Sequence, residues 1–148
     1  RWCGVITLIS NMVNFDMLEE VCDKDGRYVA VKGRINNNVL SLINVYAPPE
    51  GNSKFYQKLS EKIISFSEGT LICGGDWNCV LNHTKDTTSL KRRKNNKSKA
   101  LNLLIKEVDL CDVWRELFPF GELKPILSPY FMRFLKPSQR FYISKSGC

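Results

Sequence analysis

Residues 71–78 read Leu-Ile-Cys-Gly-Gly-Asp-Trp-Asn, and the interpretation of the whole chain depends on this stretch. The apolar run predicts a short buried strand, and the two glycines let the backbone turn sharply and approach a ligand. Asp76 and Asn78 are two residues apart, so an extended backbone would point both side chains the same way. A carboxylate can accept a proton from water and an amide can donate to a developing oxyanion, which suits phosphodiester hydrolysis. Asp and Asn after glycine are also ordinary turn residues, and the stretch alone favours that simpler interpretation.

A second stretch lies upstream, where residues 42–48 read Leu-Ile-Asn-Val-Tyr-Ala-Pro. Residues 39–46 are almost uniformly apolar, as expected of a strand covered on both faces, and the prolines that follow end it. Tyr46 therefore lies where this strand leaves the sheet, with its phenol at the sheet edge. The alternative is a core aromatic residue whose hydroxyl has found a hydrogen-bond partner.

Short turns join the strands that precede these two stretches. Residues 4–10 are a short apolar run that reads as a strand, and period-two alternation over 13–21 and 27–35 predicts two more. Asp-Gly at 25–26 and three asparagines at 36–38 predict hairpin turns. Strands joined in this way form an antiparallel meander.

Two helices are predicted from apolar residues at helical spacing. One begins at Asn52 or Ser53, and the other follows a cap at Ser98. After Pro119 the pattern loses its period, and only residues 140–144 look like a strand. The order of strands and helices predicts a layered α/β domain, with a mixed sheet and helices outside.

Charge and length narrow the class of partner. The 148 residues suffice for one domain, and the formal net charge of +7 favours a polyanionic partner, nucleic acid first. Residues 91–99 hold six basic residues in nine; Lys91, Arg92, Arg93 and Lys94 form either a solvated loop or a loop that contacts phosphates. No apolar run is long enough to span a membrane. The six cysteines show no zinc-binding spacing, and we expect them to be reduced.

Taken together, the motifs resemble a known family. Residues 44–48 (Asn-Val-Tyr-Ala-Pro), the later Gly-Asp-Trp-Asn of residues 75–78 and residues 112–119 (Asp-Val-Trp-Arg-Glu-Leu-Phe-Pro) occur in one order. They resemble the endonuclease/exonuclease/phosphatase superfamily, specifically the apurinic-endonuclease-like domain of LINE-type retrotransposons. Residues 25–33 also look like that family's hairpin. The resemblance is good over residues 4–119 and degraded over 120–148, so we interpret residues 1–148 as one partial domain.

The resemblance implies a DNase I-like four-layer α/β sandwich, here incomplete, with two mixed sheets and outer helices. It implies Mg²⁺-assisted nicking of target DNA by a monomeric domain that was originally fused to a downstream reverse transcriptase. We expect the protein to be intracellular, either nuclear or cytoplasmic. Asp76 would orient and deprotonate the attacking water, Asn78 would help to hold the scissile phosphate or that aspartate, and Tyr46 would hydrogen-bond the phosphate.

The departures from the family pattern predict an inactive chain. The family's early Asn and its main metal-binding Glu have no counterpart, since the chain starts after them, and neither does the closing Ser-Asp-His motif. Gln139 or Arg140 stands where the family has a supporting Asp. Losing several members of one catalytic constellation costs many orders of magnitude in rate.

Three other functions remain open at this point. The chain could be a non-catalytic basic module that binds nucleic acid, as its charge suggests. It could belong to the phosphatase branch of the same superfamily. It could also be a structural α/β domain without a site.

Overall fold

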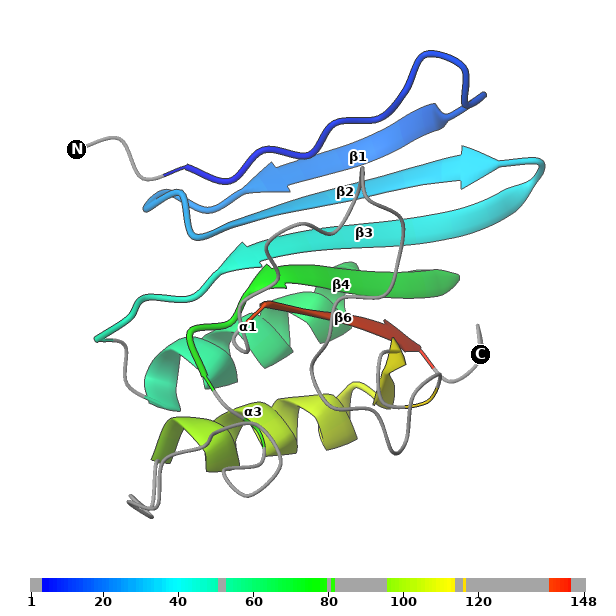
Figure 1. Cartoon of the computed structure of the whole chain (residues 1–148). Helices are drawn as coiled ribbons and strands as arrows, with labels where there is room; N and C mark the ends of the chain where they lie inside the picture. Colours follow the sequence, from blue (N-terminus) through cyan, green and yellow to red (C-terminus); the bar gives the residue numbers. More distant parts are fainter. Residues whose placement is uncertain are drawn as a thin grey trace, which may run out of the picture.

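The computed structural model describes residues 4–50, 53–79, 81, 96–113, 116 and 139–144. Within these ranges the chain forms six strands and two helices. Figure 1 shows how they are arranged. In order these are β1 (Asp16–Cys22), β2 (Tyr28–Ile35), β3 (Asn38–Tyr46), α1 (Ser53–Phe66), β4 (Thr70–Asp76), α3 (Asn96–Glu107), β5 (Leu110–Asp112) and β6 (Gln139–Ser144). Neither of these two helices is long and apolar enough to cross a membrane.

The six strands form one mixed sheet in the order β1-β2-β3-β4-β6-β5. Strands β1, β2 and β3 are antiparallel neighbours, as the turn residues predicted, and Gly26, Asn36 and Asn37 take positive φ in the two turns. Strand β4 then pairs parallel to β3, and β6 pairs antiparallel to both β4 and β5. The predicted meander and mixed sheet are therefore confirmed.

Three local predictions differ from the structure. Residues 4–10 form no strand, and β1 begins at Asp16, three residues later than the alternation suggested. Helix α3 begins at Asn96, so Ser98 lies inside its first turn and is not its cap. The last two errors concern element ends, where periodicity carries the least information.

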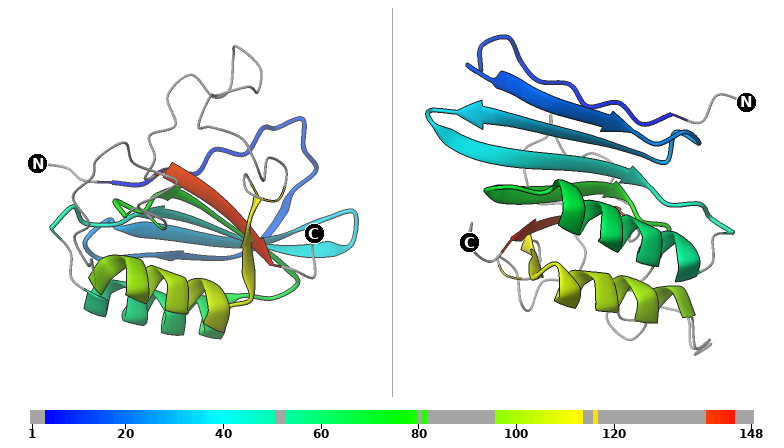
Figure 2. Two further views of the ribbon diagram at one scale, coloured as in Figure 1. Left: turned by 60° about the horizontal axis from the view of Figure 1, so that its bottom comes forward. Right: turned by 180° about the vertical axis from the view of Figure 1, so that it is seen from behind.

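Helices α1 and α3 lie side by side on one face of the sheet (Figure 2). The core fills the space between them and the sheet, with the side chains of Val45, Cys73 and Trp77 on the sheet side almost fully buried. From α1 the Tyr56 hydroxyl donates to the Trp77 carbonyl oxygen at 2.6 Å. The rings of Trp77 and Tyr142 meet edge to face, with centroids 5.3 Å apart.

The opposite face of the sheet carries the N-terminal segment (Figure 2). The Phe15 ring packs directly on the backbone of Gly33, and the Asn44 side chain donates to the Ile6 carbonyl oxygen at 2.9 Å. Leu42, Ile72 and Ile143 form a half-buried apolar row in register across β3, β4 and β6 on this face. The described residues thus form one mixed sheet with one helical layer, which is one of the two sheets that the resemblance implies.

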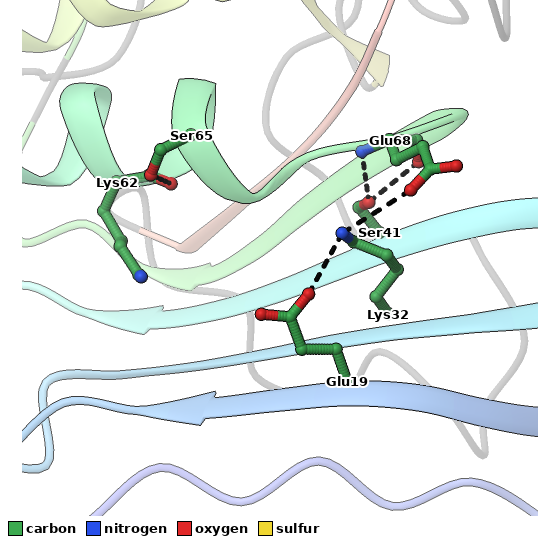
Figure 3. A network of polar contacts seen from close by, with 6 residues as sticks. All are labelled: Glu19, Lys32, Ser41, Lys62, Ser65 and Glu68. Atoms are coloured by element: carbon green, nitrogen blue, oxygen red, sulfur yellow. Dashed lines mark hydrogen bonds and ion pairs between the residues drawn. The ribbon is translucent and has the colours of Figure 1, made fainter.

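A polar cluster fixes the connection from α1 to β4 against the sheet (Figure 3). The buried Ser41 hydroxyl donates to the Glu68 carbonyl oxygen and accepts the Glu68 backbone N–H, both at 2.8 Å. The Lys32 ammonium lies 3.1 Å from Glu19 and 3.6 Å from the Glu68 carboxylate, and 5.0 Å from the Phe66 ring centroid. Since Ser41 lies on β3, these bonds set where β4 begins beside it.

Cys22, Cys73 and Cys79 form no disulfide, and burial raises the pKa of Cys73 to about 12. Cys111, in contrast, is disulfide-bonded. The expectation that the cysteines are reduced therefore holds for the first three and is wrong for Cys111.

We expect Gly75→Ala to disrupt the pairing of β3 with β4. Gly75 has φ of 128°, and a Cβ there would lie 2.0 Å from the Val45 carbonyl oxygen. The strained backbone and the clash should lower the free energy of unfolding by more than about 2 kcal/mol, measured by chemical denaturation. Gly4→Ala is the matched control, because nothing lies within 4 Å of its new Cβ. Equal stability of the two variants would contradict the close approach at Gly75.

Candidate functional site

Tyr46 and Asp76 lie at the ends of neighbouring strands. They are the last residues of β3 and β4, and they are register partners in the parallel pairing. Val45 and Cys73 point toward the helices and are buried, so alternation places Tyr46 and Asp76 on the opposite face, where both are partly exposed. The Ala47 backbone N–H donates to the Asp76 carbonyl oxygen at 2.8 Å and continues the pairing past the strand ends.

Asn78 reaches the same place by a turn. Strand β4 ends at Asp76, Trp77 is buried in the core, and Asn78 has φ of 43°. The extended backbone expected for residues 76–78 is therefore wrong, because Asn78 takes a positive φ directly after the end of β4. The turn is closed by the Asn78 backbone N–H, which donates to Asp76 Oδ1 at 3.0 Å.

The Asn78 side chain bridges the two strand ends. Its Nδ2 donates to the Ala47 carbonyl oxygen at 2.7 Å, one residue after Tyr46. Asn78 thus binds the β3 exit with its amide and the Asp76 carboxylate with its backbone. Tyr46, Asp76 and Asn78, the three residues singled out in the sequence, thus come together at the carboxyl ends of β3 and β4.

Arg27 adds a cation to this edge, although no sequence motif singled it out. The Tyr46 backbone N–H donates to the Arg27 carbonyl oxygen at 2.7 Å, and the guanidinium carbon lies 5.8 Å from the Tyr46 ring centroid. Asp23 Oδ2 accepts the backbone N–H groups of Asp25 and Arg27, at 3.2 and 3.1 Å, and so holds the hairpin turn. The predicted meander could have indicated that Arg27 lies near Tyr46. In an antiparallel pair, the start of β2 must lie beside the end of β3.

On the other side of β4, the register partner of Asp76 is Gln139, while Arg140 pairs with Gly75. Of the two residues considered as replacements for the family's supporting Asp, Gln139 is the one directly opposite Asp76. A carboxamide residue therefore occupies the position across from the candidate catalytic carboxylate.

The described residues do not supply a self-contained magnesium site. Within the described ranges, no group of three or more His, Cys, Asp or Glu side chains is arranged to hold a metal ion. Asp76 is a single carboxylate, whereas Mg²⁺ takes six oxygen ligands, several of them water or phosphate oxygens. Lys91, Arg92, Arg93 and Lys94 lie outside the described residues.

Comparison with known sequences gives a transposon protein. No protein-family model matches the chain. Over 120 residues the chain is 35% identical to a protein described as the transposon TX1 uncharacterized 149 kDa protein, from Xenopus laevis. The match covers 79% of this chain and 9% of that protein.

The solved structures that resemble this chain include endonucleases. The endonuclease domain of TRAS1, a telomere-specific non-LTR retrotransposon, has a TM-score of 0.57 at 14% identity, covering 90% of this chain and 55% of that one. The AP endonuclease LMAP from Leishmania major has a TM-score of 0.61 at 16% identity, and the match covers 94% of this chain and 50% of that one. The Xenopus laevis APE2 catalytic domain has a TM-score of 0.59 at 22% identity, and the match covers 84% of this chain and 48% of that one.

The chain thus spans about half of each of these solved domains and a small part of the transposon protein. At these identities the structural likeness establishes the fold, and the sequence match adds the transposon context. This chain has the DNase I-like α/β fold shared by the TRAS1 endonuclease and AP endonucleases, which, with the transposon match, fits a LINE endonuclease-like domain.

Proposed function

We propose that this chain is part of a Mg²⁺-dependent DNA endonuclease domain that nicks target DNA for retrotransposition. The proposal rests on one observation above all: Tyr46 and Asp76 are register partners at the carboxyl ends of two parallel strands, with Asn78 bonded to both strand ends. Ligands of α/β sheets bind at such strand ends. In the intact element, this domain would precede a reverse transcriptase.

The chemistry assigned to the three residues follows from their donors and acceptors. Asp76 would orient a water molecule and accept its proton, and the Tyr46 hydroxyl would donate to an oxygen of the scissile phosphate. Asn78 would keep Asp76 in place, since its backbone N–H donates to the carboxylate. The dependence on Mg²⁺ rests on the family resemblance, because Asp76 by itself leaves most ligand positions of the ion to other groups.

We further propose that the chain by itself does not complete the reaction. The residue opposite Asp76 is Gln139, which cannot act as the carboxylate that the resemblance expects there. Removing one member of a catalytic unit costs nearly as much rate as removing all of them. A non-catalytic nucleic-acid-binding module is the second candidate, and the net charge of +7 favours it.

The chain should show no Mg²⁺-dependent nicking of supercoiled plasmid above the background of its Asp76→Ala variant. The assay is conversion of supercoiled to open-circular plasmid on an agarose gel. Robust nicking by the unaltered chain that Asp76→Ala abolishes would contradict the proposed inactivity, although it would support the endonuclease assignment.

The position of the scissile phosphate can be tested without catalysis. In EDTA and at low salt, Asp76→Asn should bind duplex DNA about fivefold more tightly, because it removes a negative charge beside a phosphate. Two like charges about 4 Å apart repel by about 1 kcal/mol even in bulk water. Asp16→Asn is the matched control, since it removes the same charge from exposed β1 at the far edge of the sheet. Equal DNA affinity of the two variants, measured by fluorescence anisotropy, would count against a phosphate at Asp76.

We also propose that Lys91, Arg92, Arg93 and Lys94 contact DNA phosphates. Replacing all four with glutamine should weaken duplex binding. It should also make the slope of log affinity against log salt shallower by about 0.9 for each DNA phosphate that the variant no longer neutralises. Titrations at several salt concentrations measure this slope, and an unchanged slope would remove these residues from the interface.

A further inference from the structure

A cavity of about 440 Å³ lies between the β1–β2 hairpin and the start of α1, and Arg27, which contacts Tyr46, is one of its lining residues. Its lining comes from the hairpin turn and from the first two turns of the helix: Asp23, Asp25, Arg27, Tyr28, Lys54, Phe55, Lys58 and Leu59. This volume is in the range of pockets that hold small organic ligands, from about 300 to 1,000 Å³. The roles proposed above for Tyr46, Asp76 and Asn78 do not use it.

Cations and flat apolar surfaces meet in this pocket. Lys54 and Lys58 are four residues apart on α1 and therefore share a face of the helix, and Arg27 faces them from the hairpin. The partly buried rings of Tyr28 and Phe55 also line it, and Phe55 is braced edge to face by Tyr56 with centroids 5.5 Å apart. Basic side chains beside aromatic rings suit a phosphate that carries a planar base.

The two carboxylates in the lining argue against a bare anion. Asp23 already accepts two backbone N–H groups of its own hairpin turn, at 3.2 and 3.1 Å. Asp25 is exposed at the rim, where it would repel free phosphate but could accept a hydrogen bond from the amino group of a base. Burial and the nearby Asp23 raise the pKa of Tyr28, so its hydroxyl stays protonated and can donate.

Arg27 connects the pocket to the strand ends. It lines the cavity, its carbonyl oxygen accepts the Tyr46 N–H, and its guanidinium lies over the Tyr46 ring. A nucleic-acid strand with one phosphate at Tyr46 and Asp76, on the face opposite the helices, would pass around the strand ends at Arg27 to bring an adjoining nucleotide to the pocket on the α1 side. We propose that this pocket binds one nucleotide, phosphate and base together, of the strand held at the candidate site. The placement of that strand rests on the proposed function.

The first test compares two single-charge variants of α1. Lys58→Gln removes a cation from the pocket, whereas Lys62→Gln removes the same charge one turn further along the helix, outside the lining. For a labelled single-stranded octanucleotide we expect Lys58→Gln to weaken binding by about tenfold and to make the salt slope shallower by about 0.7. Lys62→Gln should change the affinity less than about twofold. Equal weakening in the two variants, at matched thermal stability, would overturn the proposal.

The second test separates a nucleotide site from a phosphate site. Titration calorimetry with deoxycytidine 5′-monophosphate and with inorganic phosphate should give at least about tenfold tighter binding of the nucleotide, because stacking adds to the phosphate contact. Lys58→Gln should weaken nucleotide binding and Lys62→Gln should not. Equal affinity for the two ligands would overturn the proposal, since the base would then contribute nothing.

The experiments distinguish an error in the proposed nucleotide binding from an error in the proposed endonuclease function. If the nucleotide binds in a Lys58-dependent way while Asp76→Asn leaves duplex affinity unchanged, the pocket is supported and the endonuclease assignment is not. If Asp76→Asn tightens duplex binding while Lys58→Gln and Lys62→Gln behave alike, the pocket proposal is overturned and the assignment is supported.

Discussion

Strands β3 and β4 run in parallel, with register partners from Leu40 and Thr70 to Tyr46 and Asp76. Two parallel neighbours end at the same edge of a sheet, so this pairing alone brings the phenol beside the carboxylate. The approach is close because Gly75 has no Cβ to meet the Val45 carbonyl. At the opposite end of the strands, Ser41 binds both backbone groups of Glu68 and fixes where β4 begins. A shift of one residue there would turn Asp76 into the helical layer.

The helical layer holds the site from behind. Trp77 is fully buried between Asp76 and Asn78, and the Tyr56 hydroxyl of α1 donates to its carbonyl oxygen. The core therefore anchors the residue in the middle of the site, and its two polar neighbours turn away from the core to the sheet edge. A site on strand ends with a buried anchor is more rigid than one on a long loop. The same helix supplies Lys54 and Lys58 to the pocket beside Arg27, so α1 both supports the site and extends it.

Much of this arrangement follows from local sequence. Alternation and turn residues predicted the meander, because side chains in a half-buried strand must alternate and because glycine and asparagine tolerate positive φ. The order of the motifs around Tyr46 and Asp76 predicted the fold that the solved endonucleases share. Element ends were less predictable: β1 begins later than its alternation, and α3 begins before Ser98. The backbone after Asp76 also differs from the extended expectation, since Asn78 takes a positive φ and its N–H donates to the Asp76 carboxylate.

By itself, then, the sequence determined most of the segments that become strands and helices, with residues 4–10 as the exception, and which polar residues stand at strand ends. Only the tertiary structure decided which strand ends meet, because pairing between distant segments depends on the register and packing of the whole sheet. It placed Gln139, and not Arg140, opposite Asp76, and it brought Arg27 over Tyr46. It also formed the pocket, whose walls come from a hairpin and a helix far apart in sequence. Pairing between residues distant along the chain requires closing the loop between them, which costs entropy. Whether such a pair forms therefore depends on the rest of the fold, and a local sequence pattern does not predict it.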